Sequence, residues 1–409
     1  MMATANGRIA REAMRARLVS MRLPLIAALS LLATPLPAFA AENLQQQVAQ
    51  VLAEAGPGTR WGVVVADMDG KEIIAIDPEG RYVPASNTKL FTTAAAFWKM
   101  GETNINSPDR SAQTLAALIA IKKKLPDLVL FGRGDARLSS AKDCKVDCLN
   151  TLVDGIANRT RRVGNIIGDD SMFLDQRWSP GMSWNNIQTD SGTGISALSI
   201  DNNEAIVTVS PSKGSSRPII NGPAYFTYEN GAWSYSKTAG TETDLLALEA
   251  VDAPRQSDHP KEIAFTRMPG SKLVRITGDI KVGSPPLRLV LGIDDPAEYT
   301  AWAVGQALRE RGVVVVGTVT SNHWMDSQTE SSRGSAKMLA FNTAVIPALS
   351  RALETNAKAN SAPPLSEDLT IINKQSQNLH AELLLRRLVN DGSDGSIEGG
   401  QKVVTAMLT

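Results

Sequence analysis

The 409-residue chain has few of the side chains that bind metals or form cross-links. It contains two cysteines and three histidines, and the histidines are scattered at positions 259, 323 and 380. A zinc site needs four converging ligands, usually cysteine or histidine. Cys144 and Cys148 lie four residues apart, and in an exported chain such a pair more often closes a disulfide loop than binds metal. We therefore expect a small disulfide and no metal site.

Long apolar runs are also scarce, with one exception at the amino end. Residues 1–40 carry five arginines and one acidic residue, and then the stretch "LPLIAALSLLATPLPAFA". A basic segment, an apolar segment and Ala38-Phe39-Ala40 form the layout of a secretory signal, with cleavage expected before Ala41. The alternatives are a short buried helix or, without cleavage, a membrane anchor. The apolar run of about a dozen residues is too short to span a bilayer.

A surplus of charge is missing as well. Without residues 1–40 the chain has 37 basic and 41 acidic residues, a net charge of about −4. No basic patch remains that would indicate a nucleic-acid partner. Since no other stretch reaches the roughly 18 apolar residues of a spanning helix, we expect a soluble periplasmic protein whose membrane association is peripheral at most. The sequence does not indicate an oligomeric state.

Helical and β-rich patterns alternate along the chain. "LQQQVAQVLAEAG" has apolar residues at helical spacing, and "RWGVVVADMDGKEIIAIDPEGRYVP" reads as two strands joined at Asp69-Gly70. From about residue 108, short β-branched runs indicate β-rich modules. One helix with an acidic cap interrupts them and ends at Gly312. Helical patterns return over residues 336–390, so we predict a helical domain interrupted by an insertion.

The segment "VPASNTKLFTTAAAFWKM" places Ser86 and Lys89 three residues apart, at the start of a helix that is apolar all round and should be buried. Residues at this spacing lie on one helix face. A lysine among apolar side chains favours its neutral form, which can take the proton of the serine hydroxyl. The helix N-terminus offers backbone N–H groups for an oxyanion. The pair predicts acyl transfer without histidine or metal.

The spacing alone is weak support, because a helix cap beside a solvated lysine is common. The S-x-x-K pattern also occurs at three other places, all in polar, loop-like segments: Ser139/Lys142, Ser210/Lys213 and Ser234/Lys237. Only Ser86 opens a strongly apolar helix.

A second polar triplet, Ser376-Gln377-Asn378, precedes another strong helix pattern. Its alternative interpretation is a helix cap, and Ser183-Trp184-Asn185 shows that S-x-N also arises by chance. Both the Ser86 and the Ser376 segments stand at the edges of the helical regions. We expect these regions to fold together across the insertion.

At these residues the chain closely resembles the penicillin-binding D-alanyl-D-alanine carboxypeptidase/endopeptidase family, the S13 serine peptidases. The resemblance rests on "VPASNTKLFTTAAA" and "PPLSEDLTIINKQSQNLHAELLLRRL", and on "DLVLFGRGDARL", "SPGMSWNN", "ISALSIDNNEAIVTVSP" and "GIDDPAEYTAWAVGQALRERGVVVVG". S-x-x-K with an S-x-N triplet is a signature of penicillin-binding proteins. The resemblance covers nearly all of the chain after the signal.

The resemblance implies a role for each residue. Ser86 would be the acylated nucleophile and Lys89 the base that activates it. Ser376 would relay the proton to the leaving D-alanine, and Asn378 would bind the substrate backbone and orient Lys89. The implied substrates are peptidoglycan peptides, the implied covalent inhibitors are β-lactams, and no cofactor is implied.

One departure from the family concerns its third motif, K-T-G, which does not occur in the chain. Lys237-Thr238-Ala239-Gly240 is a near match, but it precedes the second motif. The chain ends at Thr409, so we interpret it as truncated at the carboxyl end. This leaves a catalytically inactive cell-wall peptide-binding protein as the alternative function. A serine β-lactamase or esterase fits the long insertion less well.

The implied fold class is α/β (α+β): a penicillin-binding, β-lactamase-like transpeptidase domain with β-rich insertions and without the last part of its core sheet. We assign residues 1–40 to the signal and residues 41–107 with 345–409 to the transpeptidase-like domain. The insertion at 108–344 divides into two modules, about 108–182 with 325–344, and 183–324.

Overall fold

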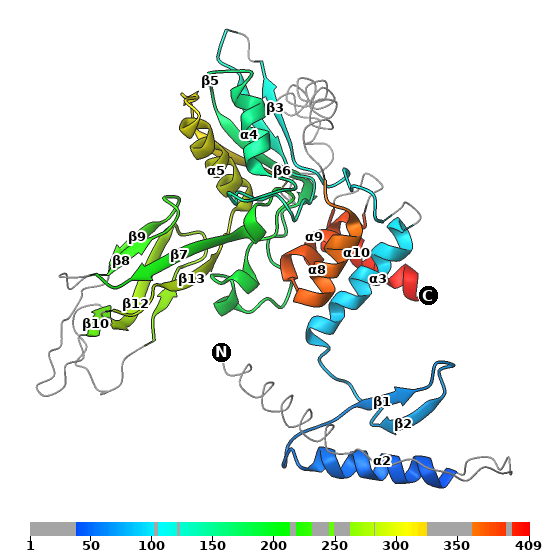
Figure 1. The fold of residues 1–409 in the computed structure, drawn as a ribbon. Coiled ribbons are helices and arrows are strands. Elements are labelled where there is room, and N and C mark those ends of the chain that lie inside the picture. Colours follow the sequence, from blue (N-terminus) through cyan, green and yellow to red (C-terminus); the bar gives the residue numbers. More distant parts are fainter. Residues whose placement is uncertain are drawn as a thin grey trace, which may run out of the picture. The chain divides into compact units, whose positions relative to one another are not determined.

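The computed structural model shows helices and strands in two compact units, residues 1–83 and 84–409 (Figure 1). The described residues are 38–101, 105–120, 123–212, 218–230, 245–248, 262–281, 283–324, 362–389 and 395–409. Most of the predicted signal, residues 1–37, and the predicted helical segment 336–360 lie outside this set. Among the described helices, none is long and apolar enough to cross a membrane.

Residues 38–83, the described part of the amino-terminal unit, form one helix and one hairpin. Helix α2 spans Ala38–Ala53, and strands β1 (Val63–Ala66) and β2 (Glu72–Ile76) pair antiparallel. In the turn, the carboxylate of Asp67 accepts hydrogen bonds from the backbone N–H groups of residues 69 and 71. Gly70 takes a positive φ of 82°, which glycine adopts without steric cost. The predicted helix and hairpin are confirmed.

A four-stranded sheet forms the first part of the larger unit. Its order is β15-β6-β4-β3, with bounds Val319–Trp324, Ile166–Leu174, Asp127–Phe131 and Leu115–Ile119. β3 and β4 are antiparallel, whereas β6 is parallel to both of its neighbours. From the sequence we assigned residues 319–324 to the module with 183–318. In the structure these residues form β15, which pairs with β6 of the other predicted module. Local patterns do not reveal which distant strands pair; the other module boundaries stay predictions.

Helix α5 (Pro296–Glu310) packs on β6 and β15. Its N-cap is Asp295, whose side chain accepts a hydrogen bond from the Glu298 backbone N–H at 2.9 Å, and Gly312 follows it with a φ of 75°. The predicted acidic cap and glycine end are confirmed. Helix α4 (Leu149–Ala157) packs against α5.

Most of the other strands form two further sheets, which lie together in Figure 1. One has the order β13-β7-β8, and in another β12 pairs with β9, β10 and β11. Their bounds are β7 Glu204–Ser210, β8 Ile219–Asn221, β9 Thr227–Asn230, β10 Leu245–Leu248, β11 Ala264–Thr266, β12 Leu273–Lys281 and β13 Leu287–Gly292. The two-residue strands β5 (Arg162–Val163) and β14 (Val314–Val315) pair in parallel. The β-rich middle of the chain is as predicted.

A buried ion pair connects the segment after β11 to the start of α5. The Arg267 guanidinium donates two hydrogen bonds to the Asp294 carboxylate, at 2.6 and 2.7 Å. It also donates to the carbonyl oxygen of Gly292. A bidentate pair with further hydrogen bonds can offset the desolvation of both charges.

Asp294→Ala is therefore expected to lower the free energy of unfolding by about 3–5 kcal/mol, because it leaves a buried guanidinium without its counter-charge. Equilibrium urea unfolding measures the change. The matched control is Lys272→Met, which removes a partly exposed pair with Glu298 and is expected to cost less than about 1 kcal/mol. Equal losses in the two variants would show that the Arg267 pair does not stabilise the fold.

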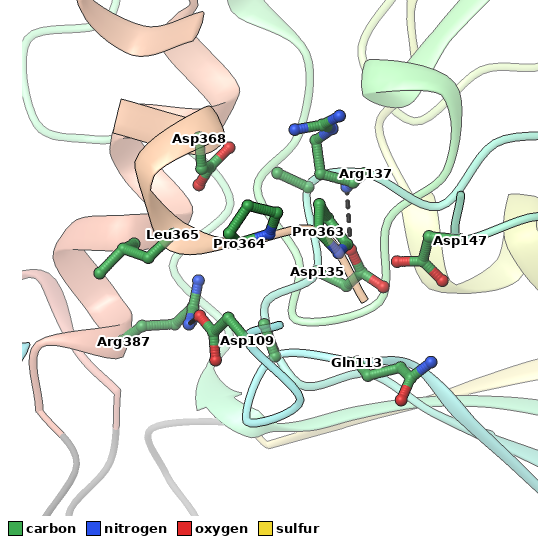
Figure 2. Close-up of a pocket in the computed structure, with 12 residues that line it drawn as sticks. Asp109, Gln113, Asp135, Arg137, Asp147, Pro363, Pro364, Leu365, Asp368 and Arg387 are labelled. Carbon is green, nitrogen blue, oxygen red and sulfur yellow. Dashed lines mark hydrogen bonds and ion pairs between the residues drawn. The ribbon is translucent and has the colours of Figure 1, made fainter. Parts of the chain in front are cut away.

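The predicted disulfide between Cys144 and Cys148 is present. Between them, Asp147 has a positive φ of 55° and turns its side chain inward, so that it is 2% exposed. Figure 2 shows its carboxylate facing that of Asp135. Neither carboxylate oxygen of Asp147 has a hydrogen-bond partner among the described residues. The disulfide loop thus holds an acidic side chain in the protein interior.

The helical segments from the two ends of this unit pack together (Figure 1). α3 (Lys89–Met100) contacts α8 (Leu365–Gln375), α9 (Asn378–Arg387) and α10 (Ile397–Leu408). Their shared apolar core includes Ala95, Ala96, Ile372, Leu384 and Leu388. The expectation that the Ser86 and Ser376 segments fold together is confirmed. Arg387 of α9 binds the carboxylate of Asp109, which joins the helices to the β-rich part (Figure 2).

The predicted burial of α3 is only half right. One face is buried through Thr92, Thr93, Ala95 and Ala96. The larger apolar side chains of the helix are exposed: Leu90, Phe91, Phe97 and Trp98. The helices that pack on α3 contact its small side chains, because these allow close approach.

Candidate active site

Ser86 and Lys89 lie within hydrogen-bond distance of each other. Nζ of Lys89 donates to Oγ of Ser86 at 3.2 Å. Ser86 belongs to a 3₁₀ turn, η1 (Ala85–Thr88), that leads directly into α3, and Lys89 is the first residue of that helix. The i, i+3 spacing therefore places the hydroxyl and the amine on one face, as the sequence predicted.

The turn is set by its first residues. Ala85 has a φ of 46°, a left-handed conformation that is unusual for a residue with a Cβ. The backbone N–H of Asn87 bonds to the carbonyl of Pro84 at 3.0 Å. Ser86 is thereby presented at the exposed end of the helix, where its hydroxyl is accessible.

The environment of Lys89 changes its basicity. Partial burial lowers the pKa of its ammonium group below the ordinary value, and the negative charge of Glu382 opposes that shift. A lowered pKa increases the fraction of neutral amine at a given pH. The neutral amine is the form that can take a proton from Ser86.

Ser376 and Asn378 lie at the junction of α8 and α9. Ser376 ends α8 in the left-handed conformation, with φ of 59°. The side chain of Gln377 accepts a hydrogen bond from the Leu379 backbone N–H at 2.9 Å and caps α9, whose first residue is Asn378. The helix-cap interpretation of this triplet thus has a structural basis.

A cavity of about 460 Å³ brings some of the predicted residues together. Lys89 and Asn378 line it from opposite ends of the sequence, whereas neither Ser86 nor Ser376 is part of its wall. The Asn378 amide donates to the carbonyl oxygen of Ser191 at 3.4 Å. Within the described chain, Ser376 forms no hydrogen bond with Ser86 or Lys89, and Asn378 forms none with Lys89. The roles of these four residues stay predictions.

The cavity wall also contains polar residues that sequence reasoning missed. Glu382 accepts a hydrogen bond from the Ser179 hydroxyl at 2.8 Å and pairs with Arg386 at 2.6 Å. Glu382 follows Asn378 by four residues, and residues at this spacing lie on one face of a helix. The spacing could therefore have indicated that Glu382 lies beside Asn378. Ser179 comes from a loop of the insertion and Ser191 from a 3₁₀ turn, Asp190–Gly192. No local pattern marks either residue.

Ser139/Lys142, the other serine–lysine match whose two residues are both described, has no comparable setting. Ser139 donates to the carboxylate of Asp201 at 3.2 Å, and Lys142 is exposed, so this pair has a structural explanation. Lys213, Ser234/Lys237 and the near match to K-T-G at residues 237–240 lie outside the described residues.

Two curated relatives align with most of the chain. A D-alanyl-D-alanine carboxypeptidase from Actinomadura sp. (strain R39) is 26% identical over 356 residues, which is 85% of this chain and 57% of the relative. A penicillin-sensitive carboxypeptidase A from Dictyostelium discoideum is 21% identical over 351 residues, 81% of this chain and 58% of the relative. The chain thus spans somewhat more than half the length of these relatives.

The fold is similar to that of penicillin binding protein 4 from Haemophilus influenzae. The TM-score is 0.59 at 16% identity, over 88% of this chain and 69% of that one. The same protein in complex with a novel β-lactam gives a TM-score of 0.53 at 16% identity, over 88% and 68% of the two chains. This likeness confirms the predicted mixed α/β penicillin-binding fold.

The family model for the D-Ala-D-Ala carboxypeptidase 3 (S13) family matches residues 44–340. The match includes Ser86, Lys89 and the β-rich insertion, and Ser376 and Asn378 follow it. Because it covers well over half of the sequence, the chain belongs to the S13 family of D-Ala-D-Ala carboxypeptidases.

Proposed function

We propose that the chain is a serine D-Ala-D-Ala carboxypeptidase that forms an acyl-enzyme on Ser86. The observation that carries the proposal is the 3.2 Å contact between Lys89 Nζ and Ser86 Oγ at the start of α3. A cavity large enough for a peptide end adjoins Lys89. Membership of the S13 family supports the same reaction.

In the proposed first step, neutral Lys89 takes the hydroxyl proton while Ser86 Oγ attacks the carbonyl carbon of the penultimate D-alanine. Backbone N–H groups at the start of α3 face the developing oxyanion. The C–N bond then breaks, and the leaving amine takes a proton that Ser376 relays. A water molecule hydrolyses the resulting ester, which restores the hydroxyl of Ser86.

Peptidoglycan stem peptides and their cross-links are the proposed substrates, the latter giving endopeptidase action. Asn378 holds the peptide backbone of the substrate in the cavity. β-Lactams are proposed to acylate Ser86, which the penicillin-binding names of the relatives support. The signal-like layout of residues 1–40 supports a periplasmic location.

Covalent labelling tests the proposal. A fluorescent penicillin is expected to label the wild-type chain on the peptide that contains Ser86, as located by mass spectrometry. Ser86→Ala should reduce labelling by at least about 10³-fold, because it removes the nucleophile. Unchanged labelling of the alanine variant would show that another residue is acylated.

Release of D-alanine separates the enzyme from the alternative, an inactive peptide-binding protein. We expect the wild-type chain to release D-alanine from a stem pentapeptide and Ser86→Ala to bind the pentapeptide without releasing it. Binding without release by the wild type would support the alternative.

A further inference from the structure

A second cavity, of about 310 Å³, lies beside the candidate active site. Its wall combines apolar side chains with amides and hydroxyls, including Trp184, Asn185, Gln188, Met268, Ser271 and Leu273. Trp184 and Met268 are each 67% exposed. A large exposed indole in a concave site is a feature of ligand-binding surfaces.

The two cavities share one wall. Within residues 182–188, Met182 and Asn186 line the active-site cavity, whereas Trp184, Asn185 and Gln188 line the second one. A substrate anchored beside Lys89 that continues past this segment therefore reaches Trp184. The second cavity is placed to bind a part of the substrate that is remote from the reacting bond.

The wall is held in place before any ligand binds. The side chain of Gln188 accepts a hydrogen bond from the Arg267 backbone N–H at 2.7 Å, and the Arg267–Asp294 pair fixes the segment after β11. The Ser183 hydroxyl donates to Oδ1 of Asn185 at 2.5 Å, which leaves the amide N–H groups of Asn185 as donors. A preformed wall lowers the entropic cost of binding.

The chemistry of the wall selects the ligand class. No carboxylate is among the described residues that line this cavity, whereas two arginines are, Arg267 and Arg275. The charge of Arg267 is paired with Asp294. A pyranose ring presents an apolar C–H face that packs on an indole, and its hydroxyl and N-acetyl groups match side-chain amides and hydroxyls. A saccharide without positive charge therefore fits this wall.

We propose that the second cavity is a glycan subsite, in which an amino-sugar ring of a muropeptide stacks on Trp184 while the attached peptide occupies the cavity beside Lys89. This assignment rests on the proposed function and names the part of the substrate that lies outside the reaction.

Binding to the non-acylating Ser86→Ala chain tests the subsite by calorimetry. A disaccharide-pentapeptide is expected to bind about 10-fold tighter than the same pentapeptide without sugars, about 1.4 kcal/mol. Adding Trp184→Ala should abolish that difference and leave the affinity for the bare pentapeptide unchanged. Trp61→Ala, which removes a 42% exposed tryptophan from the amino-terminal unit, is the matched control and should keep the difference.

Equal affinity of the Ser86→Ala chain for the two ligands would overturn the proposal. An equal loss for both ligands on removal of Trp184 would overturn it as well, since the cavity would then bind the peptide.

The experiments distinguish a wrong subsite assignment from a wrong proposed function. If penicillin does not label the wild type, the free disaccharide still tests the subsite, with binding that depends on Trp184 expected and its absence contradicting the proposal. Labelling itself should be the same in Trp184→Ala and the wild type, because the indole does not contact Ser86 or Lys89.

Discussion

Lys89→Met is expected to lower the rate of acylation by penicillin by roughly 10³-fold, the scale of a lost general base. Methionine keeps an unbranched apolar stem close to the length of lysine but has no amine to take the hydroxyl proton. The measurement is stopped-flow acylation by a fluorescent penicillin, with thermal unfolding recorded in parallel. We expect the unfolding temperature to change little, because Lys89 forms no ion pair within hydrogen-bond distance in the described chain.

Lys99→Met on the same helix is the control. Lys99 is exposed in the last turn of α3 and has no contact with Ser86, so its replacement should leave acylation unchanged. Acylation at the wild-type rate with methionine at position 89 would remove Lys89 from the mechanism.

The pH dependence of the acylation rate also tests whether Lys89 acts as the base. Because burial lowers the pKa of Lys89 from 10.5, the neutral amine accumulates below the pH at which a solvated lysine deprotonates. The acylation rate should rise with pH and level off above the lowered pKa. The methionine variant should lose this rise.

Asp147→Asn is expected to stabilise the protein at alkaline pH. Burial, together with the adjacent Asp135, raises the pKa of the Asp147 carboxyl from 3.8 to about 10, although Arg137 opposes the shift. The folded protein therefore keeps a proton that the unfolded chain releases. The asparagine amide can donate to Asp135 in place of that proton, and it does not ionise.

The sign follows from proton linkage. Below pH 3.8 both states are protonated and the carboxyl has no effect, whereas between 3.8 and about 10 only the folded state holds the proton. Because of this carboxyl, the free energy of unfolding falls as the pH rises through that window, by up to about 1.4 kcal/mol for each pH unit. The free-energy difference between asparagine variant and wild type should grow from pH 5 to pH 9.

Urea unfolding at several pH values measures this difference. Asp143→Asn, which changes an exposed carboxyl immediately before the disulfide loop, is the control and should show no such growth. A constant difference between Asp147→Asn and the wild type across the range would mean that Asp147 is ionised in the folded state.

Local rules explain which features the sequence predicted well. The cap at Asp295, the glycine end at Gly312 and the hairpin at Gly70 depend on neighbouring residues only. The contact between Ser86 and Lys89 follows from helical spacing in the same way. Periodicity and turn chemistry are sufficient for such features.

Several features that depend on distant residues were not predicted, although the packing of the Ser86 and Ser376 segments against each other was. α8 and α9 pack on the face of α3 that has small side chains, and the large apolar side chains on its other face stay exposed. The pairing of β15 with β6 joins strands about 150 residues apart. Asp147 reads as a surface residue in a polar loop, and only the fold turns it inward.

The packing of α3 on α8 and α9 has a consequence for folding during synthesis. α3 ends at Met100 and α8 begins at Leu365, so at about 5–20 residues per second a ribosome needs on the order of 10–50 seconds between them. During that time the β-rich middle can complete its own sheets, whereas Ala95 and Ala96 are not yet covered by α8 and α9. A nascent chain that stalls before Leu365 thus carries Ser86 and Lys89 without the Asn378 side of the cavity.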